Sequence, residues 1–488
     1  MKCRAAVLSA LLFSVICSAA DLPRSSPEEQ GVSSKSVLAF IEAVDKIDSM
    51  HSVMLVRHGH VIAEGWWAPY DAQTPHVMWS LSKSFTSTAV GLAIADGKLS
   101  LDDDVLKFFP EDAPAEPSAN LKLMRVRDLM RMATGHQTEP KRKPDEAWAK
   151  TFLNHPVNFK PGTHFLYNSM GTYMQSAIVQ KVTGMTALEY LKPRLFEPLG
   201  IATPVWEASP QGINAGGWGL FLHTEDIAKF GQLYLQKGQW NGKQLVPASW
   251  VAAATSMQMA NGSNPKSDWD QGYGFQFWRC RHNAFRGDGA FGQYCVVMPD
   301  QDAVLVITSG IKNMQAPLDL LWETLLPAMT PAALPADAEA AAKLADVTKH
   351  LSLRPQEGTA PAAKVFGKKY TFPANERKLE SIQLESDEKT GQVTLVAKID
   401  GAEQRIVCGR GTWVKGRASW GLLLKDQAIA ASGAWTADDT FKSKLSFYET
   451  HLMLTLTLTF AGDEMKMGSE ANVSFGPGKE PILTGSSK

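Results

Sequence analysis

The hydrophobic periodicity of this chain changes after about residue 330, and this change constrains the fold more than any other feature. Between residues 30 and 325, stretches with the spacing of amphipathic helices alternate with strand-like stretches. Helices that collect between an early hairpin and late strands favour an α+β fold, in which helices cover an antiparallel sheet. Beyond residue 365 apolar residues recur at every second position, as at Leu452, Leu454, Leu456, Leu458 and Phe460. This alternation predicts a small all-β domain, an up-and-down barrel somewhat like the lipocalins.

The predicted elements divide the chain into segments. Helices are predicted at Ser34–Ile47, Ser80–Ala95, Val126–Met132, Gly171–Val182, Thr186–Leu195, Thr224–Lys237 and Pro247–Ser256, and strands at Ser52–Arg57, Gly272–Arg279 and Val296–Ser309. Prolines 327, 331 and 335 punctuate an alanine-rich linker, which a short helix follows at about Ala336–His350. We therefore predict a main domain at 21–330, a linker with a short helix at 331–363, an all-β domain at 364–478 and a tail at 479–488.

The first twenty residues are similar to a secretory signal peptide. A basic start precedes an apolar core at Ala5–Ile16, and small residues end at Ala20. We expect cleavage near Ala20 and a mature chain that is periplasmic or secreted. A lipid anchor at Cys17 is disfavoured because the preceding Ile16 is bulky. No other segment approaches membrane-spanning length, so no transmembrane segment is expected.

Charge and cysteine content narrow the possible partners. The formal net charge is −1, so the chain offers no basic field for nucleic acid. Cleavage of the signal would leave Cys280, Cys295 and Cys408. Since export permits disulfides, we predict that Cys280 pairs with Cys295 across neighbouring strands and that Cys408 stays free. No zinc-binding spacing is present, and His58-Gly59-His60 is interpreted as a tight turn.

A serine and a lysine with helical spacing are the main candidates for catalytic residues. Ser-x-x-Lys occurs at Ser80, Ser263 and Ser386, but only Ser80 opens an apolar helical pattern, whereas the other two lie in polar turns. Residues three apart on a helix share one face, so the Ser80 hydroxyl and the Lys83 amine should be neighbours. A partly desolvated Lys83 would have a lowered pKa, which favours base chemistry.

The segment around Ser80 resembles that of the serine β-lactamase-like hydrolases, which include class C β-lactamases, penicillin-binding proteins and related esterases. Further landmarks of this family follow in register at Val126–His136, Pro161–Ser169, Gly216–Leu220, Asp226–Gly231 and Gly289–Tyr294. The resemblance implies a β-lactamase/transpeptidase-like fold, in which a helical subdomain accompanies the helix-covered sheet.

The resemblance also implies a mechanism. Ser80 would be the nucleophile, and Lys83 and Tyr167 would take and relay its proton, with the choice of base between these two left open. The backbone N–H of Ser80 and one from the late strand, near Gly287 or Asp288, would hold the oxyanion. The family chemistry uses no metal and no organic cofactor. His136 and His164 are interpreted as structural, because no carboxylate partner for a Ser-His-Asp triad is readable.

The chain departs from the penicillin-recognising members at two places. Where they have Lys-Thr-Gly, this chain has Ala284–Asp288, and its literal Lys389-Thr390-Gly391 lies in a polar turn of the β domain. The tyrosine segment reads Tyr167-Asn168-Ser169 instead of Tyr-x-Asn. Arg286 is either a substitute cation for a substrate carboxylate or a structural ion-pair partner. Asp288 is either a partner for a substrate amine or a turn residue.

These departures weaken β-lactam recognition and leave the acylation chemistry intact. The candidate substrate contacts are Asn168, Ser169, Trp218, Arg286, Gly287, Asp288 and Phe291. We expect an exported serine hydrolase that acts on a small ester, an amide or a peptide-like substrate. The alternatives are a β-lactamase or D-alanyl-D-alanine carboxypeptidase, and an inactive binding or sensor protein whose all-β domain recruits a ligand. The sequence leaves the oligomeric state open.

Overall fold

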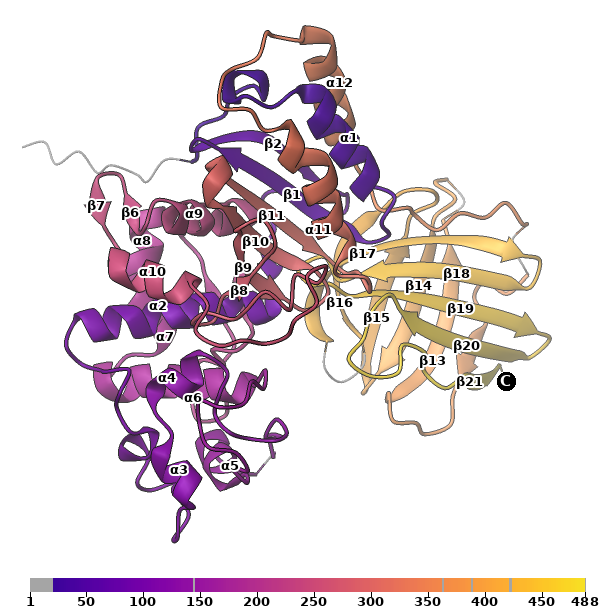
Figure 1. Cartoon of the computed structure of the whole chain (residues 1–488). Coiled ribbons are helices and arrows are strands. Elements are labelled where there is room, and N and C mark those ends of the chain that lie inside the picture. The colour runs from indigo at the N-terminus through magenta and orange to yellow at the C-terminus, as the bar shows by residue number, and fades with distance from the viewer. Residues whose placement is uncertain (1–20, 144, 362–363, 388, 421–423, 488) are drawn as a thin grey trace, which may run out of the picture.

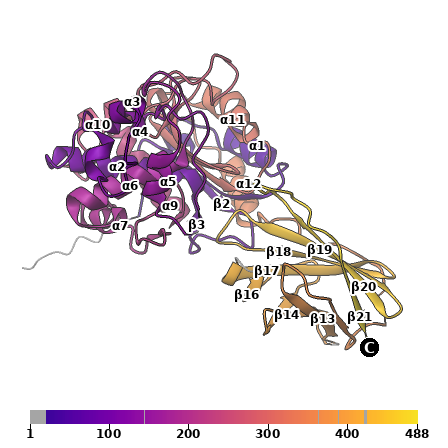
Figure 2. The same cartoon turned by 90° about the horizontal axis from the view of Figure 1, so that it is seen from below.

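The computed structural model describes residues 21–143, 145–361, 364–387, 389–420 and 424–487. The predicted signal peptide lies outside the described residues. The architecture combines an α+β part, residues 21–353, with a barrel, residues 369–487, one end of which lies against the α+β part (Figures 1 and 2). The predicted α+β fold followed by a barrel-like domain is confirmed.

A six-stranded antiparallel sheet with the strand order β2-β1-β11-β10-β9-β8 organises the α+β part. Its strands are β1 (Met50–Arg57), β2 (His60–Trp66), β8 (Trp278–Arg279), β9 (Phe285–Gly289), β10 (Gln293–Met298) and β11 (Ala303–Ser309). Two small sheets lie outside it: β3 (His76–Val77), β4 (Val205–Trp206) and β5 (Leu220–Leu222) form one, and β6 (Gln239–Trp240) and β7 (Lys243–Gln244) the other. The histidines at 58 and 60 flank the tight β1–β2 turn, as predicted.

Helices cover both faces of the large sheet. They are α1 (Ser34–Val44), α2 (Ser82–Ala95), α3 (Ala119–Leu123), α4 (Val126–Met130), α5 (Trp148–Asn154), α6 (Ser169–Thr183), α7 (Ala187–Leu191), α8 (Glu197–Leu199), α9 (Thr224–Leu235), α10 (Ala248–Thr255), α11 (Ala316–Leu320) and α12 (Ala338–Lys349). On one face, α1, α11 and α12 pack with Val53 and Leu55. On the other, α2 and α9 pack with Met54 and Val56 (Figure 1). Because helices cover both faces, β1 and β11 are buried at every position rather than alternately.

Two of the predicted strands have the wrong bounds. Val296–Ser309 is predicted as one strand, but the chain turns back at Pro299–Gln301 and Asp302 to form β10 and β11. Gly272–Arg279 was also expected to be a strand, and only Trp278–Arg279 is one. Pro299, Asp300 and Asp302 are turn-forming residues that separate the two apolar runs in the sequence, and the prediction did not take them into account.

The predicted Cys280–Cys295 disulfide is wrong. Both thiols are free and buried, as is that of Cys408. Cys280 follows β8 whereas Cys295 lies in β10, so β9 separates them in the sheet. Cys295 also faces α9, while Cys280 belongs to the apolar cluster on the opposite face. The two side chains therefore cannot meet.

The barrel contains ten antiparallel strands in the order β15-β14-β13-β12-β21-β20-β19-β18-β17-β16. They are β12 (Lys369–Thr371), β13 (Leu379–Ser386), β14 (Val393–Ile399), β15 (Ala402–Cys408), β16 (Val414–Trp420), β17 (Leu424–Ala437), β18 (Thr440–Ser446), β19 (Met453–Ala461), β20 (Glu464–Ala471) and β21 (Leu483–Ser487). An isolated bridge joins Gly409, just after the edge strand β15, to Ser432 of β17, which is the neighbour of the other edge strand β16, so the barrel is nearly closed. Leu456 and Leu458 point into the core, as their alternation predicts.

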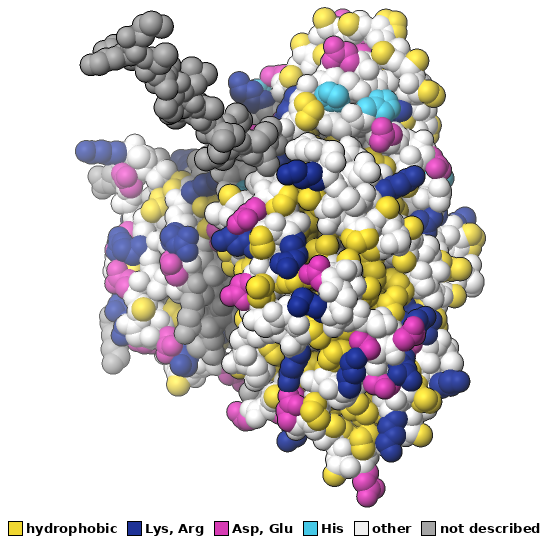
Figure 3. Space-filling view, turned by 90° about the vertical axis from the view of Figure 1, so that its left-hand side faces the viewer, with side chains coloured by type: hydrophobic (Ala, Val, Ile, Leu, Met, Phe, Trp, Pro, Cys, Tyr) yellow, Lys and Arg dark blue, Asp and Glu magenta, His cyan; other side chains and the backbone are white. Residues whose placement is uncertain are grey.

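Surface charge on the side opposite the barrel is mixed. Lys and Arg side chains lie among Asp and Glu side chains and do not gather in one patch (Figure 3). This pattern agrees with the formal net charge of −1. In the parts of the chain that the structure covers, we find no helix with the length and apolarity needed to cross a bilayer.

Candidate active site

Ser80 lies in a single 3-10 turn, Trp79–Leu81, directly before α2. The helix therefore begins two residues later than predicted, at Ser82. Met78, the residue before the turn, connects it to β5. The Leu81 N–H donates to the Met78 carbonyl at 3.0 Å, and the Met78 N–H donates to a carbonyl of β5 at 2.9 Å. Ser80 is partly exposed, whereas Leu81 and the following turns of α2 are buried. A hydroxyl is thus presented at the accessible end of a buried helix.

Lys83 is buried beside Ser80, and its amine has three neighbouring oxygens. Its Nζ lies 3.0 Å from Ser80 Oγ, 3.2 Å from Ser169 Oγ and 2.7 Å from the Gly217 carbonyl. Burial lowers the pKa of Lys83 to about 7, although the charges of Glu139 and then Asp288 act in the opposite direction. A neutral amine is therefore well populated near neutral pH.

Gly217 allows this close approach. A Cβ there would lie 3.3 Å from Lys83 Nζ and 2.9 Å from the Ser169 carbonyl oxygen. Any larger residue would press on the space that the lysine amine occupies. Gly217, within the family segment Gly216–Leu220, therefore leaves room for the amine of Lys83.

Tyr167 lies in the loop before α6 and closes the other side of the cluster. Its ring centroid is 4.9 Å from Lys83 Nζ, and the ring stacks on Trp278 with centroids 5.3 Å apart. Burial raises the pKa of Tyr167, and a hydrogen bond with the Ser80 side chain acts in the opposite direction. The phenol is therefore protonated at neutral pH. The structure brings Ser80, Lys83 and Tyr167 together.

The late strand β9 passes directly beside the Ser80 turn. β8 pairs with β9 only at Phe285 and Arg286, so Gly287–Gly289 lie against the turn with no further strand on that side. A Cβ at Gly289 would lie 2.2 Å from the Met78 carbonyl oxygen, and one at Gly287 would lie 3.1 Å from the Leu81 side chain. Only glycine fits at 289, and a side chain at 287 would require the Leu81 side chain to shift, so these two positions let the strand lie close to Ser80.

Arg286 and Asp288 form a buried ion pair on β9. Arg286 Nε donates to Asp288 Oδ2 at 2.7 Å, and its Nη1 donates to the Asp268 carbonyl at 2.6 Å and contacts Cys280 Sγ at 3.0 Å. Burial raises the pKa of Asp288, and Arg286 opposes this shift. Arg286 has no exposed surface, which fits the ion-pair interpretation rather than a substitute cation. Asp288 lines the cavity.

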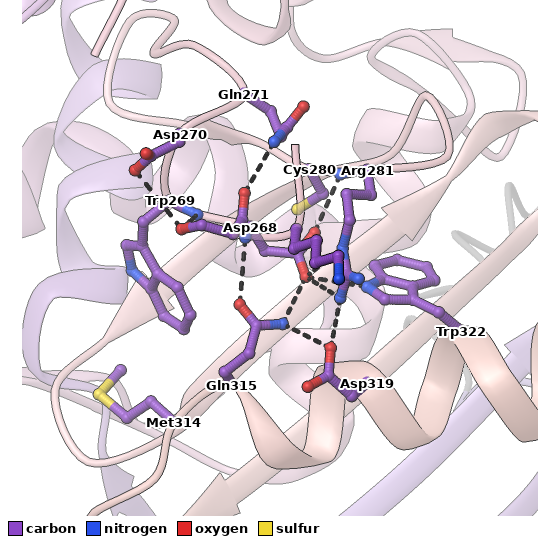
Figure 4. A network of polar contacts seen from close by, with 12 residues as sticks. Asp268, Trp269, Asp270, Gln271, Cys280, Arg281, Met314, Gln315, Asp319 and Trp322 are labelled. Atoms are coloured by element: carbon purple, nitrogen blue, oxygen red, sulfur yellow. Dashed lines mark hydrogen bonds and ion pairs between the residues drawn. The ribbon is translucent and has the colours of Figure 1, made fainter. Parts of the chain in front are cut away.

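A polar network behind this ion pair fixes the loop that carries Trp269 (Figure 4). Asp268 is fully buried and accepts hydrogen bonds from Arg281, Gln315 and the Trp322 indole N–H. Burial alone would raise the pKa of Asp268, but these donors hold it below its usual range. A buried carboxylate with this many donors is well compensated, so the network anchors the loop to α11 and the segment after it.

A cavity of about 990 Å³ opens over Ser80. Its aromatic lining consists of Trp79, Tyr167, Trp218, Trp269, Trp278 and Phe475, and its charged lining of Glu139, Lys141, Arg142 and Asp288. A second cavity, of about 720 Å³, is lined by residues 21–23, 59, 232, 235–237 and 239–242 and lies away from Ser80 and Lys83. Within the described ranges, His, Cys, Asp and Glu side chains form no group of three or more that could hold a metal ion.

The predicted substrate contacts fall into two sets. Ser169, Trp218 and Asp288 line the cavity, and Gly287 lies beneath it against the turn that carries Ser80. Asn168, Arg286 and Phe291 are not part of the lining. Asn168 is buried and its Oδ1 accepts from the Gly171 N–H at 3.0 Å, which caps the N-terminus of α6. Phe291 stacks on His451 of the barrel, with ring centroids 4.5 Å apart.

Sequence reasoning missed several residues of the site. Trp79 could have been suspected because it directly precedes Ser80. The Glu139 carboxylate accepts a hydrogen bond from the Ser169 N–H at 2.6 Å, but it lies in a charged loop that carries no readable signal. Phe475 comes from the barrel, and no pattern in the sequence connects it with Ser80.

Comparisons with known proteins identify the family of the chain. The β-lactamase family profile matches residues 41–325. The 6-aminohexanoate-dimer hydrolase of Paenarthrobacter ureafaciens is 26% identical over 286 residues, which cover 53% of this chain and 71% of that protein. A provisionally named D-alanyl-D-alanine carboxypeptidase of Escherichia coli K12 is 23% identical over 372 residues, which cover 58% of this chain and 82% of that protein.

A solved structure shares the fold. A protein of Bacillus anthracis, provisionally named a 6-aminohexanoate-dimer hydrolase, superposes with a TM-score of 0.52 at 20% identity, over 65% of this chain and 90% of that one. The family profile matches more than half of the chain. The protein therefore belongs to the β-lactamase family of serine hydrolases.

Proposed function

We propose that the protein cleaves a small ester or amide through an acyl-enzyme on Ser80, with Lys83 and Tyr167 as acid and base. The observation that carries this proposal is the 3.0 Å separation between Lys83 Nζ and Ser80 Oγ, together with a lysine pKa of about 7. A serine is a weak nucleophile until a base in hydrogen-bond reach removes its proton.

Lys83 is the better base of the two candidates. When its amine is neutral, its two remaining N–H bonds can donate to the Gly217 carbonyl and Ser169 Oγ. The lone pair then faces the Ser80 hydroxyl. Tyr167, whose pKa is raised by burial, stays protonated and is suited to donate a proton to the leaving group.

The reaction balances without a cofactor. Ser80 Oγ bonds to the carbonyl carbon while its proton moves to Lys83 Nζ. The bond to the alcohol or amine then breaks, and the leaving atom takes a proton through Tyr167, which Lys83 reprotonates. Water attacks the acyl-enzyme by the same route in reverse and releases the acid.

The developing oxyanion needs donors near Ser80. We assign this role to the backbone N–H of Ser80 and to one from the segment Gly287–Asp288, because β9 lies against the nucleophile turn there. Losing one such donor typically costs about 3 kcal/mol of transition-state stabilisation. Glycine at 287 and 289 keeps the strand close enough for this role.

The lining of the cavity supports an ester or amide substrate rather than a β-lactam. The position of the Lys-Thr-Gly element carries an arginine that is fully buried in an ion pair, so it offers no free cation for a carboxylate. Asp288, the acidic member of that pair, faces the cavity and disfavours an anionic substrate there. The name of the Paenarthrobacter relative denotes hydrolysis of an aminohexanoate dimer, which adds weight to a small amide.

The test is labelling by a fluorophosphonate probe. We expect the probe to label the wild-type protein and not Ser80→Ala. Ser263→Ala and Ser386→Ala are matched controls, because both serines share the Ser-x-x-Lys spacing but are exposed outside the cavity, and they should label like wild type. Equal labelling of wild type and Ser80→Ala would contradict the proposal and favour an inactive binding or sensor protein.

A substrate panel then separates the hydrolase classes. We expect turnover of p-nitrophenyl esters or of small amides to exceed that of a chromogenic cephalosporin. Rapid cephalosporin cleavage with negligible ester turnover would favour a β-lactamase, and release of D-alanine from a D-alanyl-D-alanine peptide would favour a carboxypeptidase.

We further propose that the chain is exported to the periplasm or secreted, on the basis of the pattern of residues 1–20. The mass of the protein recovered from the periplasm or medium should correspond to a chain that begins near Asp21. Recovery of the full-length chain from the cytoplasm alone would contradict this localisation.

A further inference from the structure

The barrel contributes an aromatic side chain to the cavity over Ser80. Phe475 lies in the segment between β20 and β21 and lines the cavity together with Trp79 and Ser80. Its ring centroid is 5.1 Å from that of Trp79 and 4.6 Å from that of Phe291. The Phe475 residue is nevertheless 72% exposed. A large aromatic ring is thus held beside the nucleophile with most of its surface unburied.

A second barrel residue holds the aromatic group together. The Trp79 indole N–H donates to His451 Nδ1 at 3.0 Å, and His451 stacks on Phe291 with a ring separation of 4.5 Å and an interplanar angle of 12°. Burial lowers the pKa of His451 to about 3, so the ring is neutral and can accept this bond. Trp79 has φ near +45° and directly precedes Ser80. His451 therefore fixes the orientation of the residue next to the nucleophile.

Main-chain and amide contacts lock these barrel segments onto the α+β part. Asn472 Nδ2 lies within hydrogen-bond distance of three acceptors, namely Ser49 Oγ at 3.1 Å, the Gly310 carbonyl at 3.0 Å and the His451 carbonyl at 2.9 Å. The Val77 N–H of β3 donates to the Glu449 carbonyl at 2.9 Å. The contact is tight, because a Cβ on Gly310 would lie 2.3 Å from the His451 carbonyl oxygen.

We infer that the barrel completes the substrate pocket and that Phe475 determines specificity for substrates that carry a flat apolar group. This inference rests on the proposed hydrolysis at Ser80. We name Trp79, Phe291, His451 and Phe475 the aromatic wall. A planar hydrocarbon group of the substrate would lie against the exposed face of Phe475, where burial and ring stacking favour binding. The barrel is then a part of the active site and not a separate ligand-binding module.

The alternative uses of these residues fit the structure less well. If Phe475 served only to pack the barrel, it would be buried in the core of the barrel, but that core is formed without it. If the barrel were an independent module, its nearest loops would not share hydrogen bonds with the turn that carries Ser80. The aromatic wall thus contains Phe475, which would bind the substrate, and His451, which attaches the barrel to the turn that carries Ser80.

The test compares Phe475→Ala with Phe475→Tyr and with the control Ile482→Ala. Ile482 follows in the same β20–β21 connection and is 67% exposed, but it does not line the cavity. The substrates are methyl acetate, methyl phenylacetate and benzyl acetate, followed by acid release in a pH-stat. They differ in whether a phenyl group is absent, on the acyl side or on the alcohol side.

We expect Phe475→Ala to lower kcat/KM about fivefold to tenfold for at least one phenyl-bearing ester, mainly through KM, and less than twofold for methyl acetate. Phe475→Tyr should retain most of the wild-type value, and Ile482→Ala should behave as wild type on all three esters. A loss of equal size on all three esters, or no loss on any, would overturn the inference.

A binding measurement separates this inference from the proposed function. Benzyl acetate should bind to Ser80→Ala in calorimetry at least fivefold more tightly than to the double variant Ser80→Ala/Phe475→Ala. Equal binding would overturn the aromatic wall even if the wild type hydrolyses esters. If the difference in binding holds but the wild type turns over no substrate, only the proposed function fails.

Discussion

The pH dependence of acylation tests the assignment of Lys83 as the base. The pKa of Lys83 is lowered by burial to about 7 from the ordinary value of 10.5. For a group with a pKa of 7, the neutral fraction is about 9% at pH 6 and about 91% at pH 8. We therefore expect kcat/KM for a neutral ester to rise about tenfold between these two pH values and then to level off.

The alternatives give profiles of different shape. A lysine with an ordinary pKa would give a rise of about 100-fold over the same interval, with no plateau below pH 10. Tyr167 as phenolate would behave similarly, because burial raises its pKa. The assay is kcat/KM for methyl acetate from pH 5 to pH 9.5, checked against the labelling rate of the fluorophosphonate probe. An inflection above pH 9 would refute Lys83 as the base.

A charge variant sharpens the test. Glu139 is the charge that raises the pKa of Lys83 most strongly. Glu139→Gln removes that charge and keeps an amide oxygen that can still accept from the Ser169 N–H, so the inflection should move to lower pH. Glu116→Gln, at an exposed position, is the matched control and should leave the inflection in place. An inflection that stays fixed in Glu139→Gln would contradict the electrostatic argument.

Two further outcomes follow from the geometry. Tyr167→Phe should lower kcat by about 10²- to 10⁴-fold, because the proton donor is lost while the ring can still stack on Trp278. A fall of less than tenfold, in a variant whose thermal unfolding is unchanged, would show that Tyr167 has no role in the mechanism. The free energy of unfolding should fall as the pH drops from about 6.5 to about 4, because burial lowers the pKa of His76 to about 4 and that of His451 to about 3. Over this range the unfolded chain binds protons that the native state does not, which lowers the free energy of unfolding by up to about 1.4 kcal/mol per pH unit for each histidine. Equal urea midpoints at pH 7 and pH 5 would contradict this expectation.

The helical and barrel segments could be predicted because their patterns are local. The helix after Ser80 was expected to end at Ala95 and does so, and residues 393–399 alternate between buried and partly exposed as a barrel strand should. Each of these patterns depends only on which face of one element is buried. β10 and β11 are predicted as one strand because the turn residues Pro299–Asp302 between the two apolar runs were not taken into account.

The convergence of Ser80, Lys83 and Tyr167 was expected for different reasons. Spacing places the first two on neighbouring positions of one turn, whereas Tyr167 was placed there only by the resemblance to a family. Whether Arg286 is a free cation or an ion-pair partner could not be read from the sequence, because the answer depends on Asp288 and on the carbonyl of Asp268, which a separate loop supplies.

The sequence by itself determined the kinds of secondary structure, the order of α+β part and barrel, and the placing of Ser80 and Lys83 side by side, since these depend on the spacing of nearby residues. Only the tertiary structure decided that Cys280 and Cys295 lie on opposite faces of the sheet, that Lys83 has a pKa near neutrality, and that Phe475 reaches the cavity. Each of these depends on burial and on contacts between segments up to several hundred residues apart. Such contacts are set by how the elements pack together, and no local pattern in the sequence records them.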